Sequence, residues 1–226
     1  MENVLAWAVL PPLALAAYIW FSDRKEREPV SLVLKCFLLG ALSALPASFL
    51  EIGGETVLDF LIGNETSTEY MFLEYFCVVA LAEEACKRYV IARKKMWNNP
   101  EFNYEFDGIV YSAASALGFA ALENILYMMD DGVLMGRLIP VHAVCGILMG
   151  YYLGHAKYYQ ARSFLFRSTY ARTMSLLVPV LIHGFWDFAL SQESDEFAYA
   201  ALIMIVVVTI FAFVRIHKSE KEDAAI

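Results

Sequence analysis

The chain has 226 residues, of which 59% are hydrophobic and only 19% are charged, and its formal net charge is −8. A soluble domain of this length carries fewer apolar and more charged residues, so the composition excludes an ordinary soluble fold. It also argues against nucleic acid as a partner, because no basic face with interleaved aromatic residues is present. The composition therefore predicts an all-α fold, a polytopic transmembrane helical bundle.

The apolar residues fall in blocks long enough to cross about 30 Å of hydrocarbon, which takes about 20 helical residues. Seven spans are predicted, over residues 4–22, 30–50, 71–92, 107–129, 138–158, 174–190 and 197–214. The first has no basic start and no small-residue cleavage site, so we expect a retained span and not a signal peptide. The connection over 51–70 is acidic and contains Gly53 and Gly54, so a loop is expected there. No repeat or linker divides the chain, which predicts one integral membrane domain over 1–226.

Lysine and arginine placement predicts the orientation, because positive residues accumulate in cytoplasmic segments. Alternate connections are basic and contain Arg24, Lys25, Arg27, Arg93, Lys94, Lys95, Lys157, Arg162, Arg167, Arg172, Arg215, Lys218 and Lys221. The opposite connections hold only Arg137. We therefore expect the N-terminus outside, the C-terminus in the cytoplasm, and a multi-pass location in the cell (plasma) membrane.

The third span carries two adjacent carboxylates, Glu83 and Glu84, in an otherwise apolar run. A charged side chain at the bilayer centre costs roughly 2.5–3.5 kcal/mol on insertion scales, so two side by side are not expected without a use. Lys87 lies four residues after Glu83 and three after Glu84, and helical spacing puts it within reach of both. Neutralisation of the pair by Lys87 and Arg88 is the structural alternative to a functional role.

Ionisable side chains also lie well inside the next three spans. They are Glu123, with Phe119 and Asn124 beside it, in the fourth span, His142 in the fifth, and His183 with Asp187 in the sixth. Asp187 lies four residues after His183, so its carboxylate can orient the imidazole. The first and last spans carry nothing comparable. We therefore predict a catalytic or transport core over approximately residues 70–190, with the other spans as a lipid-facing shell.

These residues also have structural alternatives. Glu123 and Asn124 could form a polar clamp between helices, and His142 could be a buried structural histidine. His183 and Asp187 could be a packing pair. The glycines that follow His142 at spacing four are assigned to packing, because they allow a neighbouring helix to approach closely; they are Gly146, Gly150 and Gly154.

In this order the motifs resemble those of the PrsW family of intramembrane proteases, which is itself similar to the type II CAAX prenyl endopeptidases and bacterial Abi proteins. The matching motifs are Glu83-Glu84-x-x-Lys87, Phe119-x-x-x-Glu123-Asn124, His142-x-x-x-Gly146 and His183-x-x-x-Asp187. The stretch 107–111 and Gly118-Phe119-Ala120 are also similar, so the resemblance covers roughly residues 70–190. Four motifs in order, each in its own predicted span, are much more specific than one.

The resemblance implies hydrolysis of a peptide bond of a membrane-bound protein substrate, within or beside the lipid. PrsW-like proteins are implicated in cutting an anti-sigma factor on its extracytoplasmic side. CAAX-type endopeptidases instead remove the last residues of prenylated proteins, and they are the alternative within the hydrolases. Glu123 stands where the CAAX pattern has a histidine, and Asp187 where it often has asparagine. Both differences favour the PrsW branch.

Peptide hydrolysis needs a base for water, a stabiliser for the oxyanion and an acid for the leaving amine. A carboxylate in an apolar setting is a stronger base near neutral pH, so we favour Glu83 as the base and place Glu84 second. His183, oriented by Asp187, is expected to donate to the oxyanion or to bind a metal. Two histidines and a glutamate are a known zinc set, which His142, His183 and Glu123 could supply. No HExxH motif is present, so a zinc enzyme and a metal-free glutamate protease are both left open.

Glu83 lies about ten residues before Arg93, or about 15 Å from the inner boundary along a helix. His142 lies near the outer end of its span. We therefore hypothesise a site at mid-membrane or in the outer half, with substrate entering from the outer leaflet or the extracytoplasmic face. A proton-coupled transporter is the competing class, because buried Glu, His and Asp also build proton relays, and a non-catalytic scaffold is a third. The substrate and the oligomeric state are not defined by the sequence.

Overall fold

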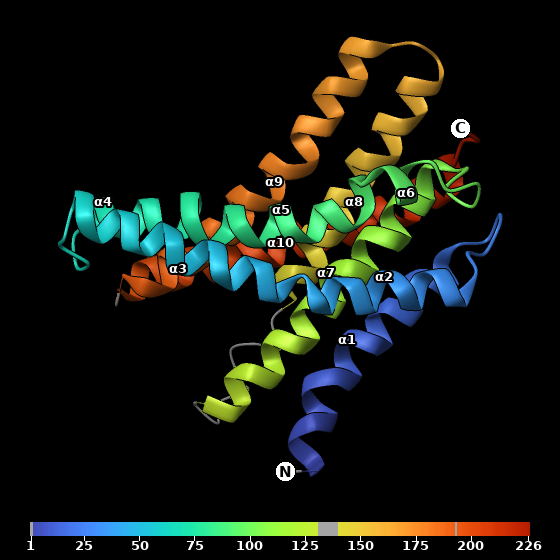
Figure 1. The fold of residues 1–226 in the computed structure, drawn as a ribbon. Coiled ribbons are helices and arrows are strands. Elements are labelled where there is room, and N and C mark those ends of the chain that lie inside the picture. Colours follow the sequence, from blue (N-terminus) through green and yellow to red (C-terminus); the bar gives the residue numbers. More distant parts are fainter. Residues whose placement is uncertain (1, 131–139, 193) are drawn as a thin grey trace.

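The computed structural model describes residues 2–130, 140–192 and 194–226. Their regular secondary structure is entirely helical, apart from one isolated bridge between Tyr104 and Ala225 (Figure 1). The elements are α1 (Glu2–Ser22), α2 (Val30–Leu42), α3 (Ala44–Leu61), α4 (Thr68–Leu73), the π-helical η1 (Glu74–Val79), α5 (Ala80–Ala92), α6 (Lys94–Trp97), α7 (Glu105–Asp130), α8 (Val141–Ala161), α9 (Leu165–Ser191) and α10 (Asp195–Glu222). The predicted all-α class is confirmed. Arg137 and the start of the predicted fifth span lie outside the described residues.

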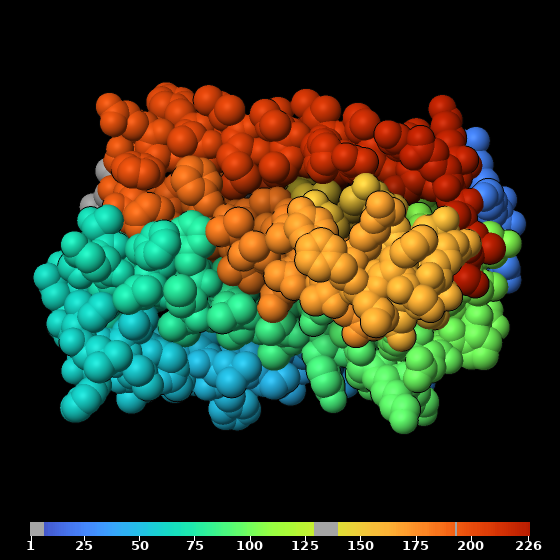
Figure 2. Space-filling model, turned by 90° about the horizontal axis from the view of Figure 1, so that it is seen from above, coloured from blue at the N-terminus to red at the C-terminus, as the bar shows by residue number. Residues whose placement is uncertain are grey.

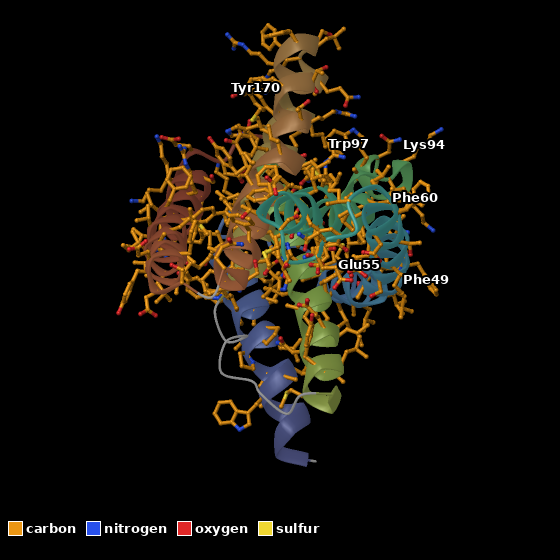
Figure 3. The ribbon with its side chains drawn as sticks, turned by 90° about the vertical axis from the view of Figure 1, so that its left-hand side faces the viewer. Phe49, Glu55, Phe60, Lys94, Trp97 and Tyr170 are labelled. Atoms are coloured by element: carbon orange, nitrogen blue, oxygen red, sulfur yellow. The ribbon has the colours of Figure 1, made fainter. Side chains whose placement is uncertain are left out.

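Four helical stretches of the described chain are long and apolar enough to cross a membrane. They are Val30–Leu61, Glu105–Met128, Leu165–Ser191 and Asp195–Glu222. Viewed from above, α10 lies along one edge of the molecule and α2 and α3 along the opposite edge, with α9 between them (Figure 2). Large apolar side chains are exposed along these outer helices, as at Phe49 and Phe60, which lie at the periphery of α3 (Figure 3). This apolar exterior is the surface expected of a protein in contact with lipid.

The predicted loop over 51–70 is wrong, because the helix continues to Leu61. Gly53 and Gly54 suggested a break, but Gly54 is a point of close approach. A Cβ there would lie 2.5 Å from a methyl carbon of Val78 in η1, so glycine allows the two helices to touch. The helix ends at Leu61, and Gly63 follows it with a φ of 66°, the left-handed conformation common after a helix C-terminus.

The basic connection predicted before the sixth span is also largely helical, because α9 begins at Leu165 and contains Arg167 and Arg172. The guanidinium of Arg172 donates to Gln160 of α8 and lies 4.3 Å from the ring centre of Trp97. Polar and aromatic partners at the membrane edge therefore extend this helix beyond its apolar part. α8 and α9 form an antiparallel hairpin (Figure 1).

α7 is at the centre of the bundle and packs most extensively against α8, α2 and α1. The predicted role of the glycines after His142 is confirmed. A Cβ at Gly150 would overlap the carbonyl oxygen of Gly108 on α7, and one at Gly154 would overlap that of Glu105. The backbones of α7 and α8 are therefore in direct contact, which brings Glu123 and His142 to the same place.

The C-terminal residues join the basic segments at one end of the molecule. Lys25 donates to the carbonyl of Asp223, and the Ile226 amide donates to the carbonyl of Asn103 at 2.7 Å. Arg162 donates to the carbonyl of Ala225 at 3.1 Å. The connections after α1, α6 and α8 therefore lie together with the C-terminal tail, as the alternating charge pattern requires.

Candidate active site

Glu83 and Glu84 lie on α5 and are buried, as is Lys87, which is 0% exposed. The Lys87 ammonium donates to Glu83 Oε2 at 2.7 Å and to Glu84 Oε1 at 2.9 Å. Arg88 points elsewhere, because its Nε donates to Ser175 Oγ on α9 at 2.8 Å. Lys87 therefore offsets one of the two negative charges of the pair, and Arg88 does not contribute. The ammonium also lies 4.0 Å from the ring centre of Phe119, which gives it a cation–π contact.

His142, in the first turn of α8, reaches the same cluster. Its Nδ1 lies 3.0 Å from Lys87 Nζ and 4.0 Å from Glu83 Oε2. Its Nε2 lies 2.7 Å from Glu123 Oε2 on α7. The ring therefore directs Nδ1 to the centre of the cluster, and a carboxylate holds its Nε2. This arrangement favours a functional role for His142 over a solely structural one.

His183, on α9, is arranged in the same way. Its Nδ1 lies 3.1 Å from Glu84 Oε1 and 3.7 Å from Glu83 Oε2, and its Nε2 lies 3.1 Å from Asp187 Oδ2. The two imidazoles meet edge to face, with ring centres 5.0 Å apart. Each histidine thus faces the cluster with Nδ1 and a supporting carboxylate with Nε2. The expected pairing of His183 with Asp187 is present.

The structure brings together all six residues that the sequence suggested as catalytic, and it places Lys87 and Phe119 beside them. Asn124 has a different main contact, because its side-chain amide donates to the carbonyl oxygen of Ala8 on α1 at 3.3 Å. The clamp between helices suggested for Glu123 and Asn124 is therefore found for Asn124. Glu123 instead supports His142.

A cavity of about 600 Å³ opens beside the cluster. Glu83, Glu123, His142, His183 and Asp187 line it, whereas the fully buried Glu84 lies behind them. Its wall also includes acidic residues that sequence reasoning did not assign to the site; they are Glu51 and Glu55 of α3 and Glu74 of η1. Glu51 and Glu55 are four residues apart and share a helix face, a signal that the loop prediction concealed. Figure 3 shows Glu55 nearer the middle of the molecule than Phe49 and Phe60.

The donor set fits a metal ion. One carboxylate oxygen or imidazole nitrogen from each of Glu83, Glu84, His142 and His183 lies within 4.8 Å of the others. Among the described residues, Glu84 Oε2 is buried without a hydrogen-bond partner, as expected of an oxygen that awaits a ligand. Glu123 is not in this group, since it bonds the opposite nitrogen of His142. Carboxylates behind metal-binding histidines orient the rings and raise their basicity.

Carboxylates and imidazoles that meet on a cavity inside an apolar helical bundle are the groups that a membrane-embedded hydrolase needs. A family profile described as PrsW family intramembrane metalloprotease matches residues 28–214. The chain belongs to this family. It is therefore an intramembrane protease that acts on a protein in the membrane.

Curated relatives support the same conclusion over nearly the whole chain. A protein named Protease PrsW from Oceanobacillus iheyensis is 34% identical, and the match covers 98% of each chain. Protease PrsW from Bacillus subtilis is 33% identical over 91% of this chain and 90% of the relative. Protease PrsW from Clostridioides difficile is 31% identical over 95% of this chain and 89% of the relative. No solved structure matches.

Proposed function

We propose that Glu83 is the general base of this protease. The observation that carries the assignment is its position, since Glu83 is the member of the carboxylate pair that lines the cavity. Glu84 is 0% exposed and lies behind it, where Oε1 faces both Lys87 and His183. A water molecule in the cavity can therefore reach Glu83, while Glu84 positions its neighbours.

The histidines act on the other side of the scissile bond. His183 and His142 both line the cavity and each is fixed by a carboxylate at Nε2, Asp187 for His183 and Glu123 for His142. Rings held in this way keep one tautomer and one orientation. Without a metal, Nδ1 of His183 is placed to donate to the developing oxyanion and Nδ1 of His142 to pass a proton to the leaving amine; with a metal bound at Nδ1, the two rings would act as ligands instead.

We propose that the metal ion of this protein is zinc, and that His142, His183 and Glu84 would hold it. Two imidazoles and a carboxylate are a known catalytic zinc set, and Nδ1 of each ring faces Glu83 or Glu84. A bound zinc ion supplies Lewis-acid polarisation of the scissile carbonyl and of a water molecule. The Lys87 ammonium bonds Glu84 at Oε1 and lies 3.0 Å from His142 Nδ1, so Lys87 and the metal would compete for the centre.

Chelation tests the metal assignment. The purified protein, freed of metal by a chelator, is expected to lose cleavage of a membrane-tethered substrate and to regain it with zinc. Wild type is expected to bind one zinc per chain, and His183→Ala none, with Glu74→Gln as the control that lines the same cavity. Full activity in chelator, with no zinc in the protein, would support the metal-free glutamate mechanism.

We propose that all seven spans predicted from the sequence cross the membrane, with the basic end of the molecule in the cytoplasm. Contacts among the basic segments support it, because Lys25, Arg162 and Asn103 all meet the C-terminal tail. The cavity is lined by parts of α7 and α9 near the ends opposite to this tail. Substrate therefore enters from the outer leaflet or the extracytoplasmic face.

The substrate class follows from this orientation. We infer a membrane-anchored protein cut on its extracytoplasmic side, and an anti-sigma factor is the substrate of this kind that the family resemblance suggests. Mapping the cleaved bond by mass spectrometry, with a co-expressed anti-sigma factor of the host, tests the proposal. A cut on the cytoplasmic side of the substrate's membrane segment would contradict it.

A further inference from the structure

A second buried acidic cluster lies at the basic end of the molecule, away from the active site. It contains Asp23 and Glu28, from the connection between α1 and α2, and Asp107, in the first turn of α7. One carboxylate oxygen of each lies within 4.8 Å of the others. The residues are only 2%, 2% and 1% exposed. Asp107 and Glu123 are 16 positions apart on α7, or about 24 Å along the helix axis, so the two sites are separate.

Two oxygens of this cluster have no hydrogen-bond partner in the described part of the chain. They are Oδ2 of Asp23 and Oδ1 of Asp107. The other oxygen of Asp107 accepts from the backbone amides of Asn103 at 2.8 Å and Tyr104 at 2.6 Å, which fixes the carboxylate. Asp107 lies within hydrogen-bond reach of the Glu28 carboxyl, whereas Asp23 Oδ2 has no such neighbour among the described residues. A buried oxygen of this kind normally has a donor or an ion beside it, so Asp23 Oδ2 points to a ligand.

The nearby lysines offset only part of the negative charge of the cluster. Asp223 adds a fourth buried carboxylate and accepts from the backbone amide of Phe106. Lys25 donates to the carbonyl oxygen of Asp223, and Lys157 to that of Phe102. Neither lysine makes an ion pair with Asp23 within the described chain.

Glu28 has a neutral hydrogen-bond donor beside it. The Tyr111 hydroxyl, which donates to Glu28 Oε2, supplies a hydrogen bond but no charge.

We propose that Asp23, Glu28 and Asp107 bind a hard divalent cation. A donor set made only of carboxylate oxygens suits Mg²⁺ or Ca²⁺ and not zinc. Mg²⁺ is the better match, because it is held by few carboxylates and keeps water in its other positions. The ion ties the connection after α1 to the start of α7, the helix that carries Glu123 at its other end.

Mn²⁺, as a paramagnetic substitute for Mg²⁺, tests the proposal directly. The full chain in detergent, freed of metal with EDTA, is titrated with Mn²⁺ and the free ion is measured by EPR. Besides any Mn²⁺ at the active site, we expect one bound Mn²⁺ per chain that Mg²⁺ displaces, with Ca²⁺ tested separately. Binding is expected to persist in His183→Ala, where the active-site metal is lost. No bound Mn²⁺ in the wild type, or binding lost in His183→Ala, would overturn the proposal.

Thermal unfolding gives a second readout. At 100 times its dissociation constant, Mg²⁺ is expected to raise the melting temperature by about 5–10 °C, whereas NaCl of equal ionic strength does not. The shift is expected to disappear in Asp23→Asn and Asp107→Asn, and to remain in Glu222→Gln, an exposed residue at the same end. An equal shift in wild type and Asp107→Asn would contradict the assignment.

Discussion

Replacement of Lys87 by methionine tests how the active site is held together. The ammonium is fully buried and lies within 3.0 Å of Glu83 Oε2, Glu84 Oε1 and His142 Nδ1. Methionine has a similar length but no charge, so Lys87→Met leaves two buried carboxylates without their cation. Removal of one partner from a buried ion pair costs about 3–5 kcal/mol.

The expected loss in melting temperature follows from that free energy. For a chain of this size, 1 kcal/mol corresponds to about 2–4 °C, so Lys87→Met should melt about 6–20 °C below wild type. Thermal unfolding in detergent measures the difference, and Lys218→Met, at an exposed lysine, is the matched control. Cleavage activity should fall by about 100-fold, because the carboxylates and His142 lose their fixed positions.

Zinc adds a second arm to this experiment. Because Lys87 and the proposed metal both face Glu84 and His142 Nδ1, zinc should stabilise Lys87→Met more than it stabilises the wild type. An unchanged melting temperature in Lys87→Met would refute the role of Lys87 as the cation that holds the carboxylate pair. An equal zinc effect in both proteins would refute the competition.

Three further predictions concern the surroundings of the site. Asp187→Asn should lower kcat by about 10–100-fold with little change in KM, because His183 loses the carboxylate that orients it; a change in KM alone would contradict this. Gly150→Ala should destabilise the protein by about 1–3 kcal/mol through overlap with Gly108, whereas Gly53→Ala, where a Cβ meets nothing within 4 Å, should not. Glu51→Gln should reduce kcat/KM several-fold for substrates with lysine or arginine beside the cleaved bond and leave neutral substrates unchanged, since Glu51 is part of an acidic cavity wall. An equal effect on neutral substrates would argue against an electrostatic role.

Much of the site was predictable because its residues follow helical spacing. Lys87 lies one turn after the carboxylate pair, and Asp187 one turn after His183, and the structure shows both contacts. Charged groups inside apolar spans mark function, since each costs free energy unless it is paired. The motifs predicted that four helices meet at the site. Close packing of α7 against α8 at the glycines of α8 brings two of these helices together.

The parts that the sequence did not predict depend on contacts between segments distant in sequence. Gly54 suggested a break in the helix, but it allows close contact with Val78 of η1. Because a loop was predicted over this stretch, Glu51 was not assigned to the site that it lines. The π-helical turn also has no local signal, although it packs on Gly184 beside His183. Which carboxylate faces the cavity and which lies behind is likewise a tertiary property, because Glu83 and Glu84 are adjacent in the chain.

The most direct measurement is the single-turnover rate at which the purified protein cuts a membrane-tethered substrate, compared between wild type and Glu83→Gln. Glutamine keeps the shape of the side chain but cannot accept the proton, so the rate should fall by about 10²–10⁴-fold. The melting temperature and zinc content should stay close to those of the wild type, and Glu74→Gln, at the wall of the same cavity, should cut normally. A Glu83→Gln protein that cuts at the wild-type rate would contradict the assignment of the active site.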